Sequence, residues 1–339
     1  MAFVRRLVTG SSQILIPWAV MDRYPEIDPF ATGMLDVGDG DLVYWETSGN
    51  PAGTPVVVLH GGPGSGSTPG GRRTWDPAKY LIVQLDQRNC GHSTPPASDP
   101  ATDLSSNTTH ALIADLEQLR RHLGVDRWVV WGGSWGCTLA LAYAEQYPER
   151  VRALILVSVT MTRRSDVRWL YHETGRYLPA EWHAFRDGVP ESERDGDLVA
   201  AYDRMLNHSG DVEVQARAAE LWCAWEDAAV SLEPGWRPSE RYRDPGFRMQ
   251  FARIVAHYFS NGAWLEEGQL LRDAGRLAGI PGVLIHGRFD VGGPVDVPWL
   301  LAQAWPDARL EVVGSAGHQG SAETTRLLLE AAAQFADAP

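Results

Sequence analysis

Several kinds of protein are excluded by what this chain of 339 residues has little of. Its three cysteines, Cys90, Cys137 and Cys223, lie far apart and show no metal-ligand spacing. A sparse, odd set of cysteines argues against a disulfide framework and is typical of a reducing compartment. The net charge of −13 leaves no basic surface for nucleic acid. We therefore expect a cytoplasmic protein without a metal site and without a nucleic-acid partner.

Long hydrophobic runs are also missing. No stretch reaches the ~20 apolar residues of a membrane-spanning helix, so we expect no membrane association. The first twenty residues faintly resemble a signal peptide, but the polar residues Ser11, Ser12 and Gln13 interrupt the apolar run and no small-x-small cleavage site follows. We expect residues 1–23 to form a flexible N-terminal extension, in which Met21 could be an alternative start.

Tryptophan, in contrast, is abundant. Several of the 14 tryptophans fall between Trp169 and Trp264, in one part of the chain. They could build an aromatic core or line a substrate pocket, since aromatic side chains commonly form the walls of such clefts. Composition alone does not choose between these two interpretations.

The order of the predicted elements indicates an α/β fold. A hairpin is predicted around residues 38–41, and short apolar segments suited to buried strands alternate with segments of helical period. Such alternation builds a doubly wound, mostly parallel sheet with helices on both faces. The predicted strands cover residues 34–37, 42–46, 56–60, 81–85, 128–131, 153–159, 283–286 and 309–313, and the predicted helices begin near residues 109, 138, 297 and 322.

One long segment departs from this alternation. Residues 161–278 show no convincing buried strand, and helix-like stretches occur at 197–205, 212–229 and 247–259. A helical insertion into one α/β core explains this better than two consecutive domains. We therefore predict a core formed by residues 24–160 and 279–339, interrupted by a helical domain over 161–278.

A candidate nucleophile follows the predicted strand at residues 128–131. The segment Gly-Gly-Ser-Trp-Gly at 132–136 fits the pattern Gly-x-Ser-x-Gly. In that motif the serine occupies a strained turn between a strand and a helix, and its hydroxyl is exposed above the edge of the sheet. A glycine-rich turn is often only a turn, but the strand before it and the helix after it are the context that the motif requires. We predict Ser134 as the nucleophile.

A base and an acid are predicted after the last two strands, because ligands bind beyond the carboxyl ends of the strands in such sheets. His318 would take the serine proton, and Asp290 would hold the imidazole in the correct tautomer. The chain order Ser134, Asp290, His318 is that of the α/β-hydrolase triad. The alternatives are that Asp290 is a helix N-cap and that His318 is an ordinary surface residue.

Two backbone N–H groups are expected to stabilise the oxyanion. One belongs to Trp135, the residue after the nucleophile. The other is predicted at Gly62, with Gly61 beside the substrate, in the loop His-Gly-Gly-Pro-Gly at 60–64. A glycine loop after a strand could also bind phosphate, but the Gly-Lys-Ser/Thr of a P-loop is absent here.

Together these blocks resemble the prolyl aminopeptidase (proline iminopeptidase) family of α/β hydrolases. The resemblance extends from about Tyr24 to the C-terminus and preserves the order and spacing of the blocks. It implies an α/β-hydrolase core with a helical cap, and the removal of an N-terminal residue, often proline, from a peptide or amide. It also implies neither a metal nor a cofactor. The matching blocks are 60–64, Asp-Gln-Arg-Asn-Cys-Gly-His-Ser at 86–93, 132–136, His-Gly-Arg-Phe-Asp at 286–290 and 317–318.

The resemblance also implies a site for the amino group of the substrate. The family binds this group with cap carboxylates, one of them in a Trp-x-x-Trp-Glu motif that is present here as Trp222, Trp225 and Glu226. A carboxylate in an aromatic pocket would pair well with an ammonium group, although Glu226 could also be a solvated helix residue. Valine replaces the second family glutamate, at Val255.

The loss of the second carboxylate leaves the choice of substrate open. Glu266 or Glu267 could replace it from a nearby loop. The first hypothesis is a serine aminopeptidase acting on a peptide or small aminoacyl amide with a free amino group. The second is an esterase or aminoacyl-amide hydrolase acting on a small molecule such as a natural product. The third is a hydrolase-fold binding protein without catalytic activity.

Overall fold

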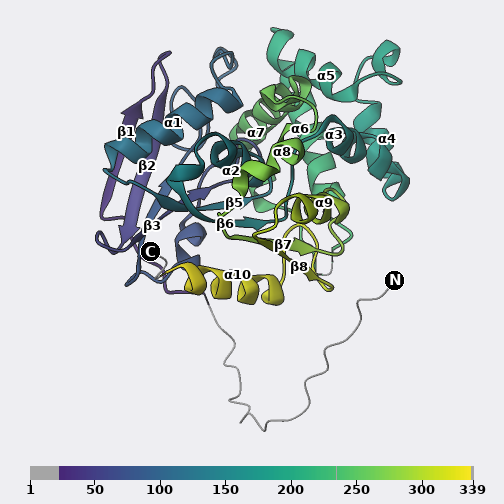
Figure 1. The fold of residues 1–339 in the computed structure, drawn as a ribbon. Helices are drawn as coiled ribbons and strands as arrows, with labels where there is room; N and C mark the ends of the chain where they lie inside the picture. The colour runs from purple at the N-terminus through teal and green to yellow at the C-terminus, as the bar shows by residue number, and fades with distance from the viewer. Residues whose placement is uncertain (1–22, 234, 337–339) are drawn as a thin grey trace, which may run out of the picture.

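One sheet of eight strands forms the centre of the molecule (Figure 1). The computed structural model describes residues 23–233 and 235–336. The strand order is β1-β2-β4-β3-β5-β6-β7-β8; β2 is antiparallel to both of its neighbours, and all other pairs are parallel. The strands are β1 (Ala31–Asp36), β2 (Leu42–Gly49), β3 (Thr54–Leu59), β4 (Tyr80–Leu85), β5 (Trp128–Gly133), β6 (Val151–Val157), β7 (Gly282–Gly287) and β8 (Ala308–Val313).

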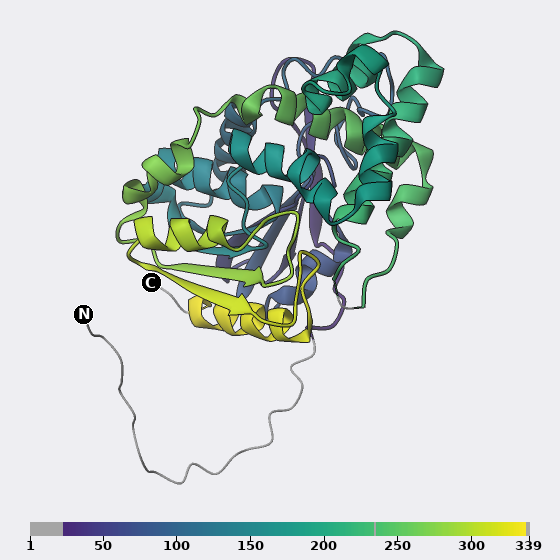
Figure 2. The same cartoon turned by 90° about the vertical axis from the view of Figure 1, so that its right-hand side faces the viewer.

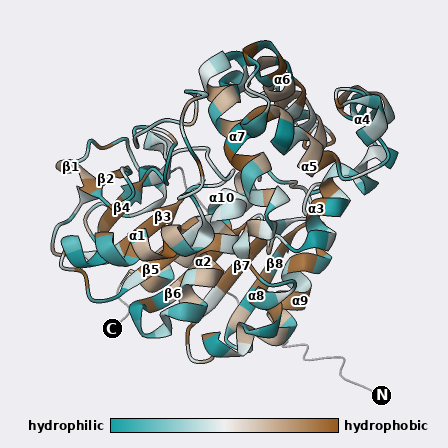
Figure 3. Ribbon diagram, turned by 90° about the horizontal axis from the view of Figure 1, so that it is seen from above, coloured by the Kyte–Doolittle hydropathy of each residue, from teal (hydrophilic) through white to brown (hydrophobic). Residues whose placement is uncertain are grey.

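Helices cover both faces of this sheet. Helices α1, α2 and α9 lie on one face and α10 lies on the other (Figure 1), and each face has its own apolar cluster. The strands between them are buried on both sides, which explains why β5 to β7 are largely hydrophobic (Figure 3). These helices are α1 (Thr109–His122), α2 (Trp135–Gln146), α9 (Asp296–Ala304) and α10 (Ala322–Phe335).

The chain between β6 and β7 forms a separate helical layer, which we call the cap (Figure 2). No strand occurs between β6 and β7 in the described part of the chain. The cap helices enclose an apolar cluster of their own, rich in aromatic side chains. They are α3 (Arg164–Tyr171), α4 (Pro179–Arg186), α5 (Leu198–Asp203), α6 (Val212–Ala229) and α7 (Pro245–Ser260). The short helix α8 (Gln269–Arg272) follows them in the chain but packs with the core, because its Leu270 belongs to the apolar cluster on the α1, α2 and α9 face of the sheet.

The α/β fold predicted from the sequence is confirmed, including the hairpin between β1 and β2. Two details differ. Helix α2 begins at Trp135, three residues earlier than expected, because the turn at the serine leads directly into it. The short cap helices α3 and α4 gave no clear periodic signal.

The exact domain boundaries stay a prediction, and the expected N-terminal extension lies almost wholly outside the described residues. No helix in the described part of the chain is long and apolar enough to cross a bilayer.

The register of the parallel strands places the site. Gly133 on β5 is opposite Val157 on β6, and Val157 is opposite Ile285 on β7. The carboxyl ends of these strands therefore meet at one edge of the sheet, where ligands bind in this fold class. The next residue after each of these positions begins the site described below.

Candidate active site

Ser134 occupies the sharp turn between β5 and α2. Its backbone has φ 55° and ψ −123°, a conformation that non-glycine residues rarely adopt. The neighbouring glycines allow this turn, since a Cβ at Gly132 would lie 2.3 Å from the Gly136 carbonyl oxygen. A Cβ at Gly136 would lie 2.2 Å from the carbonyl oxygen of Leu59 on β3. The motif is thus a close contact between backbones that only glycine permits.

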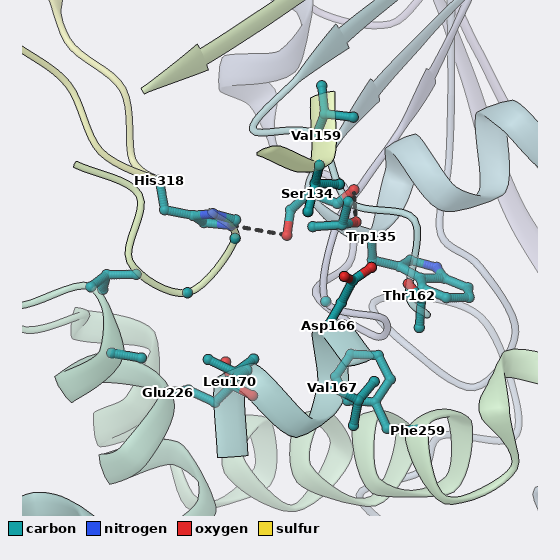
Figure 4. Close-up of a pocket in the computed structure, with 17 residues that line it drawn as sticks. Ser134, Trp135, Val159, Thr162, Asp166, Val167, Leu170, Glu226, Phe259 and His318 are labelled. Carbon is teal, nitrogen blue, oxygen red and sulfur yellow. Dashed lines mark hydrogen bonds between the residues drawn. The ribbon is translucent and has the colours of Figure 1, made fainter. Parts of the chain in front are cut away.

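Ser134, His318 and Asp290 form a continuous chain of hydrogen bonds. His318 Nε2 lies 2.9 Å from Ser134 Oγ (Figure 4), and His318 Nδ1 lies 2.7 Å from Asp290 Oδ2. Asp290 Oδ1 also accepts the Gly293 N–H at 2.8 Å. Asp290 does not cap the following helix, because α9 begins at Asp296. The three predicted residues are therefore brought together, in the geometry that nucleophilic catalysis requires.

The charges of Asp290 and His318 stabilise each other. Burial would raise the pKa of Asp290, but the nearby His318 and its hydrogen bond hold that pKa below its usual value. Burial would lower the pKa of His318, but Asp290 and two further carboxylates raise it to about 9. Asp290 therefore stays ionised, and the imidazolium form of His318 is strongly stabilised.

A second histidine near the site has a different role. His286 lies near the end of β7 and is buried, with Nε2 2.7 Å from the Gly293 carbonyl oxygen. Its Nδ1 accepts the N–H of Val159 at 3.0 Å. Because both ring nitrogens bind backbone, His286 holds the β6 and β7 loops together and is not available as a base.

The predicted oxyanion donors lie beside Ser134. Trp135 is the first residue of α2, so its N–H points to the N-terminal end of the helix. A Cβ at Gly61 would lie 3.2 Å from Ser134 Cβ, which places this glycine directly against the nucleophile. Gly62 has φ +116° and lines the same cavity as Ser134. The donor roles of Gly62 and Trp135 stay a prediction.

A cavity lies between the serine and the cap. Ser134 and His318 lie at one end, and Glu226 from α6 lies across from them (Figure 4). The walls between them are mostly apolar. They include Val159, Val167, Leu170, Val230, Phe259 and Val297.

Glu226 has an unusual environment for a carboxylate. Its Oε1 accepts a hydrogen bond of 2.5 Å from the Tyr171 hydroxyl. Burial raises the pKa of Glu226, although that hydrogen bond opposes the shift. No ion pair to Glu226 occurs within residues 23–233 and 235–336. The cavity therefore contains a partly desolvated carboxylate that can accept a cation.

The side chains of Trp222, Trp225 and Val255 lie in the interior of the cap, away from the cavity that Glu226 lines. Trp222 and Trp225 are buried in the aromatic cluster of the cap, where Trp222 packs on Tyr171 at 4.8 Å between ring centroids. Val255 on α7 is fully buried in the same cluster. The described lining of the cavity includes none of these three side chains. Direct substrate contacts by Trp222 and Trp225 stay a prediction.

The two glutamates considered as replacements lie elsewhere. Glu267 accepts the Arg164 N–H at 2.9 Å, and Glu266 forms an ion pair of 2.8 Å with Arg272. Instead, the structure adds Asp166, which the sequence did not suggest and which lines the cavity (Figure 4). Asp166 is already paired with Arg163 at 2.7 Å, so it is less available than Glu226.

Metal ligation has no candidate in the described part of the chain. No group of three or more His, Cys, Asp and Glu side chains there has the arrangement of a metal site. The three cysteines are buried and unpaired, and burial raises the pKa of Cys90 and Cys223.

Known proteins are similar to this chain in sequence or in fold. The family model described as "alpha/beta hydrolase fold" matches residues 54–214. A Streptomyces coelicolor protein named "Probable proline iminopeptidase" is 49% identical over 320 residues, which cover 93% of this chain and 98% of that protein. The Xylella fastidiosa (strain Temecula1) protein named "Proline iminopeptidase" is 47% identical over 87% of this chain and 93% of its own length.

A solved structure agrees with the fold. The crystal structure of the Mycobacterium smegmatis proline iminopeptidase superposes with a TM-score of 0.57. It covers 90% of this chain and 97% of its own, at 19% sequence identity. At this identity the match concerns the fold alone.

Proposed function

Because the chain belongs to the proline iminopeptidase family of α/β hydrolases, we propose that it is a serine aminopeptidase that removes an N-terminal residue, preferably proline, from peptides or small aminoacyl amides. The observation that carries this proposal is the hydrogen-bonded chain of Ser134, His318 and Asp290 facing Glu226 across one cavity. Relatives named for proline supply the preferred residue.

The first half of the reaction forms an acyl-enzyme. Ser134 Oγ attacks the carbonyl carbon of the first residue while His318 Nε2 takes the hydroxyl proton. The N–H groups of Gly62 and Trp135 stabilise the oxyanion of the tetrahedral intermediate. His318 then gives its proton to the leaving nitrogen, the C–N bond breaks, and the shortened peptide departs.

The second half releases the amino acid. A water molecule attacks the ester carbon and passes a proton to His318, which returns it to Ser134 Oγ as the C–O bond breaks. Asp290 keeps the imidazole oriented and stabilises its charged form throughout. A second hollow shares Ser134 and His318 with the first and extends to Arg241, which leaves room for the departing part of the substrate.

Specificity for a free N-terminus comes from Glu226. A protonated proline nitrogen would supply the cation that this carboxylate lacks. The apolar wall next to Ser134 would contact the pyrrolidine ring, which needs no hydrogen bonds from the protein. Exopeptidase activity follows, because an internal residue has no ammonium group to place there.

The test is a panel of aminoacyl arylamides and esters, each with a free or an N-acetylated amino group. We expect hydrolysis of the free proline arylamide, weak or no hydrolysis of the blocked forms, and a loss of at least about 10⁴-fold in kcat for Ser134→Ala. The exposed Ser105→Ala is the matched control and should retain full activity. Full activity in Ser134→Ala would refute the proposal.

One observation favours a second candidate, an esterase acting on a small neutral molecule. Val255 is buried and apolar where the resemblance implies a second amine-binding carboxylate, and Asp166 is neutralised by Arg163. A site with one free carboxylate binds an ammonium group less strongly than a site with two. Faster hydrolysis of N-acetylated esters than of free-amine substrates would favour this candidate.

A further inference from the structure

Each polar group of His318 has a hydrogen-bond partner, which fixes this residue in its loop. The imidazole binds Ser134 and Asp290, as described above. The His318 carbonyl oxygen accepts the hydroxyl of Ser158, the residue directly after β6, at 2.7 Å. Its backbone N–H is bound by a residue of the cap, Glu233. Neither the motifs nor the family resemblance pointed to Glu233.

Glu233 binds two successive N–H groups of this loop. Its Oε1 accepts from the His318 N–H, and its Oε2 accepts from the Gln319 N–H at 2.9 Å. Glu233 is only 7% exposed. It follows α6 closely, so the helix that presents Glu226 to the cavity is connected by a short stretch of chain to the carboxylate that holds the histidine loop.

The residue before the histidine is adapted to this contact. A Cβ at Gly317 would lie 2.3 Å from both Cγ and Cδ of Glu233. The glutamate side chain therefore occupies the space that any other residue at 317 would need. A Gly-His pair at this position is thus explained by the approach of a cap side chain to the loop.

A purely structural contact would not need a charge. Burial raises the pKa of Glu233, and the two N–H bonds and the nearby His318 oppose that shift. Burying a carboxylate is costly unless it is well compensated. The two oxygens of Glu233 accept the two N–H groups, and its charge is compensated by the charged form of His318. The charge of Glu233 is therefore better explained by the group beside it, the imidazole of His318.

We propose that Glu233 is a positioning residue for His318. Glu233 connects the loop that carries His318 to the end of the cap that holds Glu226. This inference rests on the proposed role of His318 as the base. Glu233 does not touch the reacting atoms. It fixes the backbone of the histidine, and its negative charge stabilises the imidazolium formed when Ser134 is deprotonated.

The charge has a measurable consequence. The titratable groups that face His318 are Asp290, Glu233, Glu226 and His286. Burial lowers the pKa of His318, and the three carboxylates raise it. Removal of one of them must lower that pKa, so the neutral, basic form of His318 will be reached at a lower pH.

The experiment compares Glu233→Gln and Glu233→Ala with Glu220→Gln, an exposed glutamate of α6 that pairs with Arg217. Hydrolysis of proline p-nitroanilide is measured from pH 5 to 10, together with the rate at which a fluorophosphonate labels Ser134. For Glu233→Gln we expect kcat to fall about 10- to 100-fold with little change in KM, and the acid limb of both profiles to move to lower pH by about half a unit or more. Glu220→Gln should match the unsubstituted protein.

Labelling of Ser134 distinguishes a failure of the proposed aminopeptidase function from a failure of the proposed role of Glu233. An unsubstituted protein that is labelled but does not hydrolyse aminoacyl arylamides would refute the proposed function and leave the role of Glu233 to be judged from labelling alone. Lower thermal stability of Glu233→Gln with an unmoved pH limb and kcat within about twofold would overturn the inference. If Glu233→Ala does not fold, Glu233→Gln and the shorter Glu233→Asp decide, and a limb unmoved in Glu233→Gln refutes it.

Discussion

The two ends of the cavity hold carboxylates in opposite situations. At the core end, Asp290 accepts hydrogen bonds from His318 and Gly293, and its pKa is held low against the effect of burial. At the cap end, Glu226 accepts a hydrogen bond from Tyr171, and burial raises its pKa. The core carboxylate already has its cationic partner, and the cap carboxylate does not.

This difference matches the proposed roles of the two ends, catalysis at the core end and recognition of the substrate amine at the cap end. The Asp290–His318–Ser134 chain lies at the ends of strands whose positions are set by the whole sheet, so its geometry is complete before a substrate binds. Glu226 lies on a helix of the cap and has an acceptor available for a positive group. A ligand that brings its own cation would remove the cost of burying Glu226, and under the proposed function this would favour substrates with a free amino terminus.

Of the substitutions at the two carboxylates, Asp290→Asn should reduce catalysis most. We expect kcat to fall by about 10⁴-fold, because an amide cannot keep His318 in the required tautomer or stabilise its charged form. The pH profile should change as well. The unsubstituted protein needs neutral His318, whose pKa is about 9, so its kcat/KM should rise with pH up to that range.

In Asp290→Asn the pKa of His318 should fall, and the acid limb should move to lower pH. Asp296→Asn, at the first residue of α9, is the matched control. An unmoved acid limb in Asp290→Asn would show that a group other than His318 controls the rate. The amino group of the substrate also titrates, so the profile is repeated for labelling by the fluorophosphonate, which has no amino group.

At the cap end, Glu226→Gln keeps the shape of the side chain and removes its charge. The loss of one charge-assisted contact is worth ~1.5–3 kcal/mol, so we expect KM for free-amine substrates to rise about 10- to 100-fold. Activity on N-acetylated esters should be unchanged, since these substrates have no cation for Glu226. Equal losses on free and blocked substrates would mean that Glu226 supports the cap and does not recognise the amine.

The core end could be predicted from the sequence, and the cap end only in part. Ser134, Asp290 and His318 follow strands that carry strong local signals, and the parallel topology brings strand ends together whatever the loops between them do. That is why residues 184 positions apart could be assigned to one hydrogen bond. The G-x-S-x-G turn likewise depends on close backbone contacts that only glycine allows.

The cap gave weaker signals, because its side chains pack in a cluster without a repeating backbone frame. Helix periodicity located α6 and α7 but could not show that Trp222, Trp225 and Val255 point into the cap interior. Glu233 and Tyr171 contact the site from positions outside every motif. Sequence separation hides such contacts, since they depend on how the helices of the cap are arranged.

A third carboxylate sharpens the comparison, because it lacks a partner but lies outside the site. Glu145, near the end of α2, is 4% exposed, and neither of its carboxylate oxygens has a hydrogen-bond partner among the described residues. Burial raises its pKa from 4.5 to about 8. Glu117 on α1 is equally buried, but Arg120 and the Tyr143 hydroxyl bind it, and its pKa is lowered despite burial.

These opposite shifts predict opposite effects of substitution on stability. Glu145 is neutral in the folded protein up to about pH 8 and ionised in the unfolded chain above about pH 4.5, so its contribution to the free energy of unfolding is lost as pH rises through this window. Glu145→Gln should therefore stabilise the protein by about 1–3 kcal/mol more at pH 8.5 than at pH 5. Glu117→Gln should destabilise it by a similar amount at both pH values, because the stabilisation from a lowered pKa is already present above the unfolded value of 4.5 and is lost only below it. Urea unfolding at both pH values measures the two differences. If Glu145→Gln gave no gain at high pH, a buried carboxylate whose oxygens have no hydrogen-bond partner would carry no cost in this fold. The lack of an ion-pair partner at Glu226 would then no longer indicate a site that a substrate amine completes.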